Sequence, residues 1–276
     1  MGNDGSAVMT DHELNQFIEH VRCQTGINLD ASKRYLLESR LGPILQQFTI
    51  TYSELLKVVS VTNSVENQAL ISAITTNETY FFRDEHPFNL LKYRLIPDLL
   101  GKNESAVVKI ASAACSSGQE AYSITMVLKE ILFDLAKFRV QIQAFDISDD
   151  IIVAASRGEY SKFEVERGLS DEKIRSYFDC NDGRYQVKPE LRSIVSFSKQ
   201  NILKPVGMIA KYNIVFCRNV VNYFGFKDRS LLFDNLADML LPGGVLVIGA
   251  TEFIDDKLGR FVKKSDKGSV YYKKVN

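Results

Sequence analysis

The segment ITTNETYFFRDEHPF, residues 74 to 88, places an arginine directly behind three consecutive aromatic rings. Asn77, Glu78 and Thr79 come before the rings, and Arg83 and Asp84 follow them. Because a helix or a strand buries one face, three successive bulky rings cannot all point into the same core. Some of the rings are therefore expected to pack around something other than an ordinary core, beside a guanidinium group that can grip both oxygens of a carboxylate.

A second group is SAACSSGQEAYS, residues 112 to 123, where a predicted strand runs into a loop of small residues and then into a helix. Small residues at 113 to 118 would let a ligand approach the backbone closely. Glu120 would lie at the start of the helix, where a carboxylate disfavours a phosphate and suits a cationic or hydroxylated ligand. Taken alone, this loop is better explained as an ordinary tight turn between strand and helix.

Polar side chains also follow two other predicted strands. Asp146 ends the strand in AFDIS, a position where a carboxylate typically binds ribose hydroxyl groups. The alternative for Asp146 is a helix cap, but Ser148 or Asp149 can serve as that cap. Arg218 and Asn219 directly follow the strand YNIVFC, with Asn222 and Tyr223 close behind. Such side chains are candidates for a binding site, although Tyr223 alone fits an aromatic ring packed under a loop equally well.

The elements that must position these groups begin with helices and continue with an alternating pattern. Residues 9–74 read as a small helical domain that opens with a capping box, Thr10 to Glu13. Residues 1–8 read as a disordered lead. From about residue 105, apolar strand-like runs alternate with helical stretches, which indicates a parallel sheet covered on both faces. The runs lie at 107–113, 140–147, 212–217 and 244–251.

Two further features refine this α/β fold. The C-terminal stretch FVKKSDKGSVYYKKV predicts a hairpin, and a parallel sheet closed by a hairpin suits the seven-stranded methyltransferase sheet. Residues 160–200 interrupt the alternation and predict a small β insertion. We therefore expect a second domain at 75–276, with residues 75–90 as the segment that links it to the helical domain.

The composition excludes several classes of function. The 276 residues include 34 Lys+Arg and 34 Asp+Glu, so the formal net charge of zero does not call for nucleic acid or an anionic membrane. The four cysteines form no CxxC pair and the three histidines all lie in the first third, so no metal site is expected. Free cysteines, no apolar run near ~20 residues and no signal-peptide pattern predict a cytoplasmic protein that is not inserted in a membrane.

The chain resembles the CheR family of chemotaxis receptor methyltransferases over nearly its whole length. The segments that carry the resemblance are TTNETYFFRD, SAACSSGQEAYS, AFDIS, IVFCRNVVNYF and LPGGVLVIGATE. The resemblance implies a class I S-adenosylmethionine-dependent methyltransferase sheet preceded by an all-α domain. It also implies an enzyme that methylates glutamate side chains of bacterial chemoreceptors and releases S-adenosylhomocysteine.

The resemblance also implies which residues form the site. Residues 75–90 would fold over the cofactor, and Arg83 and Tyr223 would lie beside the transferred methyl group. The cofactor-binding positions of the family match Asn77, Thr79, Arg83, Glu120, Asp146, Asn201, Ile202, Arg218 and Asn219. The departures are mild: alanine stands at 114 and 121, where the family usually has glycine and proline, Gln119 replaces a common glutamate, and GATE replaces GHSE.

Partners follow from the same resemblance. We expect a monomer that acts on the cytoplasmic helical region of chemoreceptors. Lys33, Arg34 and Arg40 lie close to one helical face that could dock on acidic receptor helices, although a solvated basic face is common. In part of the family the β insertion binds a peptide tether at the receptor C-terminus. The stretch FDCNDGRYQVKPEL is shorter here and has only Gly183, which predicts a tight turn and no pentapeptide tether.

Two alternatives remain. The first is a methyltransferase for another acceptor, such as DNA or a small molecule. DNA amino-methyltransferases usually carry an Asn/Asp-Pro-Pro-aromatic motif after the fourth strand, where this chain has CRNVVNYF. The second is a non-catalytic S-adenosylmethionine-binding module, against which Arg83 and Tyr223 argue.

Overall fold

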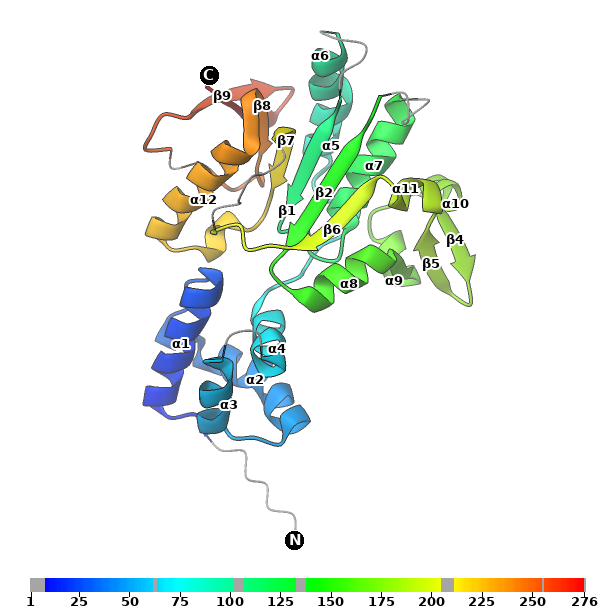
Figure 1. Cartoon of the computed structure of the whole chain (residues 1–276). Coiled ribbons are helices and arrows are strands. Elements are labelled where there is room, and N and C mark those ends of the chain that lie inside the picture. Colours follow the sequence, from blue (N-terminus) through cyan, green and yellow to red (C-terminus); the bar gives the residue numbers. More distant parts are fainter. Residues whose placement is uncertain are drawn as a thin grey trace. The chain divides into compact units, whose positions relative to one another are not determined.

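The computed structural model describes residues 8–61, 64–101, 107–132, 138–204, 211–254 and 256–275, so most of the lead predicted at 1–8 lies outside the described residues. The chain divides into two compact units (Figure 1). Unit 1 comprises residues 1–76 together with the short segment Tyr223–Gly225, and unit 2 comprises residues 77–222 and 226–276. Each unit is described separately below.

Unit 1 is helical, and side-chain caps fix where its helices begin. The predicted capping box between Thr10 and Glu13 is present and opens α1. A second capping box, between Thr51 and Glu54, opens α3, and Ser64 caps α4. The helices are α1 (Asp11–Thr25), the short 3₁₀ helix η1 (Ala31–Lys33), α2 (Arg34–Phe48), α3 (Tyr52–Val59) and α4 (Val65–Ile74). Their apolar faces bury one core that includes Leu14, Phe17, Leu37, Leu41, Leu55 and Leu70.

A short segment from the far end of the chain completes unit 1. The 3₁₀ turn η3 (Val221–Tyr223) leads into it. The N–H of Asn28 donates to the carbonyl oxygen of Tyr223 at 2.8 Å, and Ile27 forms an antiparallel bridge with Phe224. Tyr223 therefore belongs to the packing of the helical unit.

Unit 2 is built on a seven-stranded sheet of order β6-β2-β1-β7-β8-β10-β9. The first five strands in that order are parallel, and the terminal hairpin adds the two antiparallel strands. This confirms the predicted α/β class and the closing hairpin. The strands are β1 (Lys109–Ala113), β2 (Gln141–Asp146), β6 (Val195–Lys199), β7 (Tyr212–Cys217), β8 (Leu240–Val247), β9 (Phe261–Asp266) and β10 (Ser269–Lys274).

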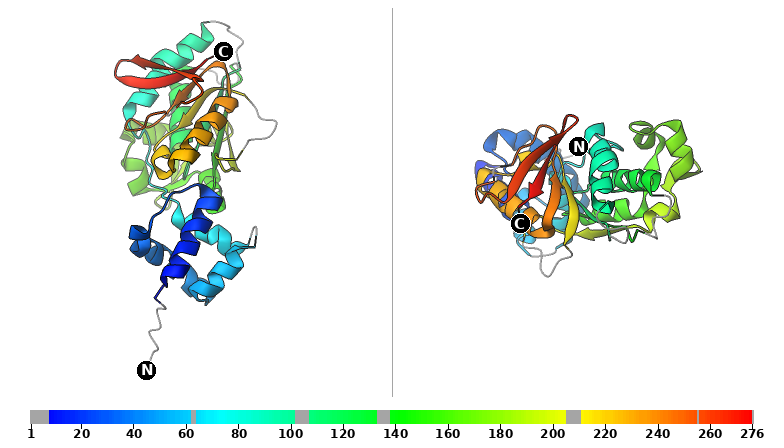
Figure 2. Two further views of the ribbon diagram at one scale, coloured as in Figure 1. Left: turned by 90° about the vertical axis from the view of Figure 1, so that its left-hand side faces the viewer. Right: turned by 90° about the horizontal axis from the view of Figure 1, so that it is seen from above.

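Helices cover both faces of this sheet. Seen from above, α12 lies on one face, and α5, α6 and α7 lie on the other (Figure 2). Apolar side chains of the central strands, such as Ile110, Ile142 and Phe216, are buried between these layers. The helices are α5 (Glu85–Leu90), the π-helical turn η2 (Leu91–Leu95), α6 (Ile96–Leu100), α7 (Gln119–Ile131), α8 (Asp149–Arg157) and α12 (Phe226–Met239).

The β insertion is a three-stranded antiparallel sheet of order β3-β5-β4. Its hairpin turn contains only Asp182 and Gly183, with φ angles of 48° and 76°. The structure differs from the sequence interpretation at the end of the insertion, because β6 pairs with β2 and so belongs to the large sheet. The elements are β3 (Glu159–Ser161), α9 (Lys162–Glu166), α10 (Asp171–Tyr177), β4 (Phe178–Asn181), β5 (Arg184–Val187) and α11 (Pro189–Arg192).

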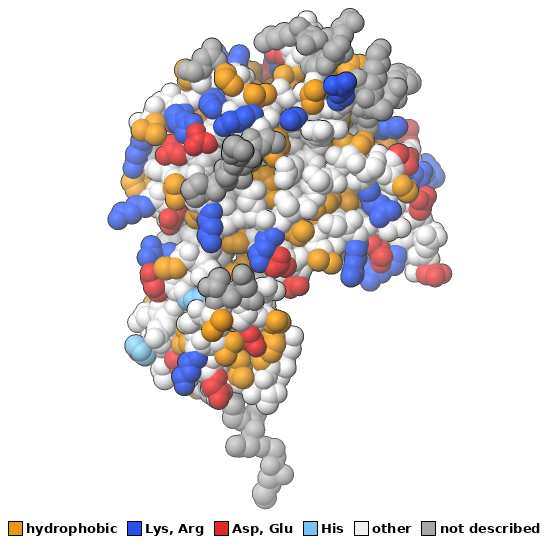
Figure 3. Space-filling view, viewed as in Figure 1, with side chains coloured by type: hydrophobic (Ala, Val, Ile, Leu, Met, Phe, Trp, Pro, Cys, Tyr) orange, Lys and Arg blue, Asp and Glu red, His pale blue; other side chains and the backbone are white. Residues whose placement is uncertain are grey.

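The distribution of charge on the surface and the free cysteine thiols agree with what the composition predicts. Basic and acidic side chains are interspersed over the visible face, without a broad field of one sign among the described residues (Figure 3). All four cysteines are free thiols, and burial raises the pKa of the Cys115 and Cys217 thiols. Within the described ranges, none of the helices has the length and apolar character needed to cross a bilayer.

Ala114 provides a stability prediction, because its φ angle is 57°, in the left-handed region that favours glycine. We expect Ala114→Gly to raise the free energy of unfolding by up to about 1 kcal/mol, since glycine adopts this conformation without the clash of a Cβ. Calorimetric unfolding of both proteins measures the difference.

The matched control is Ala154→Gly, the same change at an exposed position inside α8. For Ala154→Gly we expect the free energy of unfolding to fall by about 0.5–1 kcal/mol, because glycine is unfavourable within a helix. If both variants lose stability to the same extent, strain at Ala114 is not the reason for the effect.

Candidate active site

The register of the parallel strands brings the predicted site loops together. Ala113 at the end of β1 pairs with Phe145 of β2 on one side and with Cys217 of β7 on the other. The loops that follow these strands therefore leave the sheet at the same edge. Ligands of open α/β sheets bind at the carboxyl ends of the strands, so this edge is the candidate site.

Asp146 lies at this edge with its carboxylate buried. Its Oδ2 accepts a hydrogen bond from the N–H of Ser116 at 3.0 Å, and its Oδ1 accepts one from the N–H of Ser148 at 3.2 Å. Burial raises the pKa of Asp146 above its usual value, although the backbone donors partly oppose that shift. The predicted alternative, a helix cap, falls to Ser148, which accepts a hydrogen bond from Ile151 at the start of α8.

Gln200 is a candidate site residue that the sequence analysis did not name. Its N–H donates to the carbonyl oxygen of Asp146 at 2.8 Å, so Gln200 lies beside Asp146 at the end of β6. Its side-chain Nε2 is buried and finds no acceptor in the described part of the chain. A buried donor without a partner is costly, which makes Nε2 a candidate donor to a ligand. The QN dipeptide carried the signal, but only its second residue was singled out.

The two predicted residues next to Gln200 have structural contacts. Oδ1 of Asn201 accepts a hydrogen bond from the N–H of Leu203 at 2.9 Å. Ile202 is buried, and its carbonyl oxygen accepts a hydrogen bond from the side chain of Asn235 at 3.0 Å. These contacts fix the loop after β6, and a role of Asn201 and Ile202 toward the cofactor stays a prediction.

Arg218 and Glu120, both predicted to contact the cofactor, form an ion pair with each other. Nη1 of Arg218 lies 3.1 Å from Oε2 of Glu120, and Oε1 of Glu120 accepts a hydrogen bond from the Ser112 hydroxyl at 2.7 Å. Nη2 of Arg218 donates to the Asp84 carboxylate at 2.8 Å and to the carbonyl oxygen of Arg83 at 2.7 Å. The Arg218 side chain is only 2% exposed. Two of its three nitrogens are therefore held by protein acceptors.

The segment 77–84 packs against the body of unit 2. The carbonyl oxygen of Asn77 accepts a hydrogen bond from the Ser116 hydroxyl at 3.0 Å. Phe81 is fully buried, with its ring edge-on to Tyr160 at 4.9 Å and to Phe178 at 5.5 Å. The N–H of Phe82 donates to the Ser123 hydroxyl at 3.0 Å. Thr79 lies within this segment, half-buried.

Arg83 is held differently from Arg218. Its Nη1 donates to the carbonyl oxygen of Glu78 at 2.7 Å, and its guanidinium carbon lies 5.9 Å from the centre of the Tyr80 ring. The carboxylate of Glu78 pairs with Arg167 at 2.9 Å. Among the described residues, Arg83 forms no ion pair with a carboxylate. It is a half-buried cation whose remaining donors are available to an anionic partner.

Glu252, in the GATE segment, is a second residue that the sequence analysis did not assign to the site. Its Oε2 accepts hydrogen bonds from the N–H groups of Asn219 at 2.8 Å and Gly249 at 2.7 Å. Its Oε1 accepts one from the N–H of Val221 at 2.8 Å. Asn219 has a φ angle of 59°. This buried carboxylate therefore ties the loop after β7 to the loop after β8 and holds Asn219 in a left-handed conformation.

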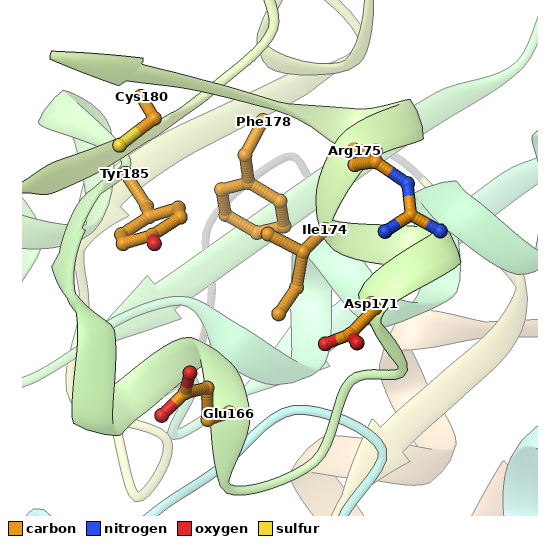
Figure 4. Close-up of a pocket in the computed structure, with 7 residues that line it drawn as sticks. All are labelled: Glu166, Asp171, Ile174, Arg175, Phe178, Cys180 and Tyr185. Carbon is orange, nitrogen blue, oxygen red and sulfur yellow. The ribbon is translucent and has the colours of Figure 1, made fainter.

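A separate pocket lies within the β insertion. Its volume is about 450 Å³, and it is lined by residues of α9, α10, β4 and β5. Figure 4 shows Ile174 and Phe178 together at its centre, with the carboxylates of Glu166 and Asp171 on one side. The pocket is thus an apolar hollow with a charged rim, on which Arg175 also lies. Phe178 also packs on Phe81, so one side chain that lines the pocket contacts the segment 77–84.

Comparison with known protein families matches both parts of the chain. Residues 12–75 match the CheR methyltransferase all-alpha domain. Residues 77–268 match the CheR methyltransferase SAM binding domain. Together the two matches span nearly the whole chain.

Similar proteins include chemotaxis protein methyltransferase 1 of Pseudomonas aeruginosa, 38% identical, with 91% of this chain and 93% of that protein covered. A chemotaxis protein methyltransferase of Vibrio parahaemolyticus is 37% identical, over 95% of this chain and 97% of that protein. One of Borreliella burgdorferi is 35% identical, over 89% of both chains.

The residues at the sheet edge fit S-adenosylmethionine, the cofactor named in the family match of residues 77–268. The Asp146 carboxylate offers acceptors for ribose hydroxyl groups, and the buried Gln200 Nε2 offers a donor that has no protein acceptor among the described residues. The loop at 113–118 consists of small residues, which allow a ligand to approach its backbone closely. Asp146, Gln200 and this loop are the groups that would hold the nucleoside.

Asp146→Asn should weaken binding of S-adenosylhomocysteine at neutral pH by about 1–3 kcal/mol, because the neutral amide offers one acceptor oxygen where the carboxylate offers two. Calorimetric titration measures the affinity. The pKa of Asp146 is raised, so its protonation begins at a higher pH than for an ordinary aspartate. The affinity of the unaltered protein should therefore fall as the pH is lowered toward that pKa, whereas Asp146→Asn should lose this pH dependence.

Asp149→Asn serves as the control. Asp149 lies three residues further on, at the surface, where it pairs with Lys199. We expect it to keep both the affinity and the pH profile. An unchanged affinity of Asp146→Asn would remove Asp146 from the site.

Proposed function

Because the chain belongs to the CheR methyltransferase family and depends on S-adenosylmethionine, we propose that it transfers methyl groups to glutamate side chains of bacterial chemoreceptors. The products are glutamate methyl esters and S-adenosylhomocysteine. The similar proteins of Pseudomonas and Vibrio are named for methyl transfer in chemotaxis, which supports this substrate class. We further propose that the enzyme acts as a cytoplasmic monomer on the helical part of the receptor.

The observation that carries the proposal is that Arg83 forms no ion pair with a carboxylate among the described residues. A guanidinium group binds a carboxylate through two parallel hydrogen bonds, and it does so best when no internal carboxylate occupies it. Arg83 is anchored by a backbone carbonyl and by the Tyr80 ring, and the neighbouring Glu78 carboxylate is engaged by Arg167. Arg83 is thus suited to receive the carboxylate of a substrate glutamate.

The chemistry needs no general base. Bound S-adenosylmethionine supplies the methyl group that is transferred. A glutamate side chain is already ionised near neutral pH, since its ordinary pKa is about 4.3. The protein must therefore orient one carboxylate oxygen and exclude water, and such placement can supply roughly 7–11 kcal/mol in favourable cases. The grip of Arg83 must stay moderate, because strong stabilisation of the ground-state anion would slow the attack.

Tyr223 is proposed to position the substrate carboxylate from another side. It lies in the segment that joins unit 1, and its side chain is 39% exposed. An exposed phenol can donate a hydrogen bond or pack its ring against the substrate. Its role beside the transferred methyl group remains part of the proposal.

The basic residues of unit 1 are proposed to dock on the acidic receptor helices, but they are not equivalent. Arg34 pairs with Asp11 and also with Glu38 at 3.6 Å. Arg40 donates to the carbonyl oxygen of Ile74 and, at 3.2 Å, to the hydroxyl of Thr76. Both arginines therefore stabilise unit 1 as well, and Lys33 is the residue of the three best placed to act only through its charge.

Arg83→Ala should abolish most methyl transfer while changing the affinity for S-adenosylhomocysteine little. The proposed role is orientation in the transition state, so kcat should carry the loss, by about 100-fold or more. The assay incubates the enzyme with labelled S-adenosylmethionine and membranes that contain chemoreceptors, and it follows base-labile label on protein, the mark of a methyl ester.

The control is Arg94→Ala. Arg94 is an exposed arginine of η2, and it pairs with Asp98 of α6 at 3.0 Å. It should leave the rate unchanged. Label that resists base, or no label on the receptor, would exclude glutamate as the acceptor. A loss confined to cofactor affinity in Arg83→Ala would exclude the carboxylate-orienting role.

We also propose that the enzyme finds its substrate without a C-terminal tether, because the β4–β5 turn has only two residues and leaves little loop to clasp a peptide. Titration of the protein with a receptor C-terminal pentapeptide should give no saturable binding in the micromolar range. Saturable binding would contradict the proposal, and its loss in Tyr185→Ala would assign the peptide to the pocket of the insertion, which Tyr185 lines.

A further inference from the structure

Two arginines share the same short stretch of the segment 77–84. Arg167 comes from the insertion, directly after α9, and its Nη2 lies 2.9 Å from Oε1 of Glu78. Its guanidinium carbon lies 4.6 Å from the centre of the Tyr80 ring. Arg83 contacts the same two residues, through the carbonyl oxygen of Glu78 and the ring of Tyr80. The Glu78 carboxylate is hydrogen-bonded to Arg167, and Arg83 acts on it only electrostatically.

The insertion packs tightly against this segment, so Arg167 is held next to Glu78. A Cβ on Gly168 would lie 1.9 Å from the carbonyl oxygen of Phe81, so only glycine permits this approach. Phe81 is clamped between the rings of Tyr160 and Phe178, both of which belong to the insertion. Arg167, next to Gly168, is therefore held at a set distance from Glu78.

We propose that Arg167 is a positioning residue that keeps the Glu78 carboxylate away from Arg83, so that the guanidinium of Arg83 stays available to the substrate carboxylate. This inference rests on the proposed function, because it assigns Arg83 to a carboxylate substrate. Without Arg167, Glu78 would become an internal carboxylate within reach of Arg83 and would compete with the substrate. The β insertion would then contribute to the reaction, in addition to packing against the segment 77–84.

The first test is rescue in the methylation assay. Arg167→Ala should lower kcat/KM for the receptor about 2- to 5-fold, the range expected for an exposed ion pair between Glu78 and Arg83. The affinity for S-adenosylhomocysteine should not change. Glu78→Gln alone should have little effect, and Arg167→Ala/Glu78→Gln should return to the original rate, because the amide no longer competes for Arg83.

The control is Arg184→Ala, another exposed arginine of the insertion, which pairs with Glu159 at 3.5 Å and has no contact with Glu78. It should retain full activity. An unchanged rate in Arg167→Ala overturns the inference. A loss that Glu78→Gln does not rescue also overturns it, since that result would mean that Arg167 acts through packing alone.

The second test does not depend on catalysis, so it separates this inference from the proposed function. Arg167 lowers the pKa of Glu78, first through their hydrogen bond. With Arg167 present, Arg83→Ala should leave the pKa of Glu78, measured by NMR titration, nearly unchanged. In the Arg167→Ala background, Arg83→Ala should raise it clearly, because Glu78 would have moved to Arg83. If Arg83→Ala has no effect in either background, Glu78 does not compete for Arg83 and the inference fails, whatever the substrate is.

Discussion

The site depends on one buried cation. Arg218 joins the end of β7 to the start of α7 through Glu120, and to the segment 77–84 through Asp84 and the carbonyl oxygen of Arg83. Its guanidinium also lies 5.7 Å from the centre of the Phe88 ring of α5. Removing one partner of a buried ion pair typically costs about 3–5 kcal/mol, because the other charge is left uncompensated. The three elements therefore depend on one another, because the loss of any one acceptor would leave the charge of Arg218 less compensated.

Backbone strain is concentrated around the same edge of the sheet. Left-handed φ angles occur at Phe82 (53°), Asp84 (57°), Ala114 (57°), Ser116 (49°) and Asn219 (59°), none of which is glycine. Each such residue costs of order 1–3 kcal/mol and persists only where its surroundings enforce it. The enforcing contacts are visible: Ser123 holds the N–H of Phe82, Asp146 holds that of Ser116, and Glu252 holds that of Asn219. The chain thus uses buried polar groups to keep the loops in shapes that it would otherwise leave.

The location of the candidate site could be predicted from the sequence, but most of its side-chain contacts could not. Alternating apolar runs located the strand ends, and parallel strands necessarily end at a common edge, so Asp146 and Arg218 could be brought to one edge from the pattern alone. The pairing of Glu120 with Arg218 spans 98 residues and depends on side-chain direction, which periodicity does not contain. Val195–Lys199 was assigned to the insertion because a short strand carries no mark of the sheet it joins, and its pairing with β2 is decided by tertiary contacts.

Arg218 and Arg83, the two arginines at this edge, differ in their acidic partners. Arg218 is paired with two carboxylates, Asp84 and Glu120, so the formal charge of this cluster of three side chains is negative. Asp146 adds a further carboxylate at the end of β2. A negative surround favours a cofactor that bears a positive sulfonium, and it favours the neutral thioether left after methyl transfer less. Arg83 lies outside that cluster, without an acidic partner among the described residues. Under the proposed function, Arg83 would therefore attract the anionic substrate, whereas the carboxylates at the candidate cofactor site would favour a cation, and the two reactants would be drawn to different parts of the same edge.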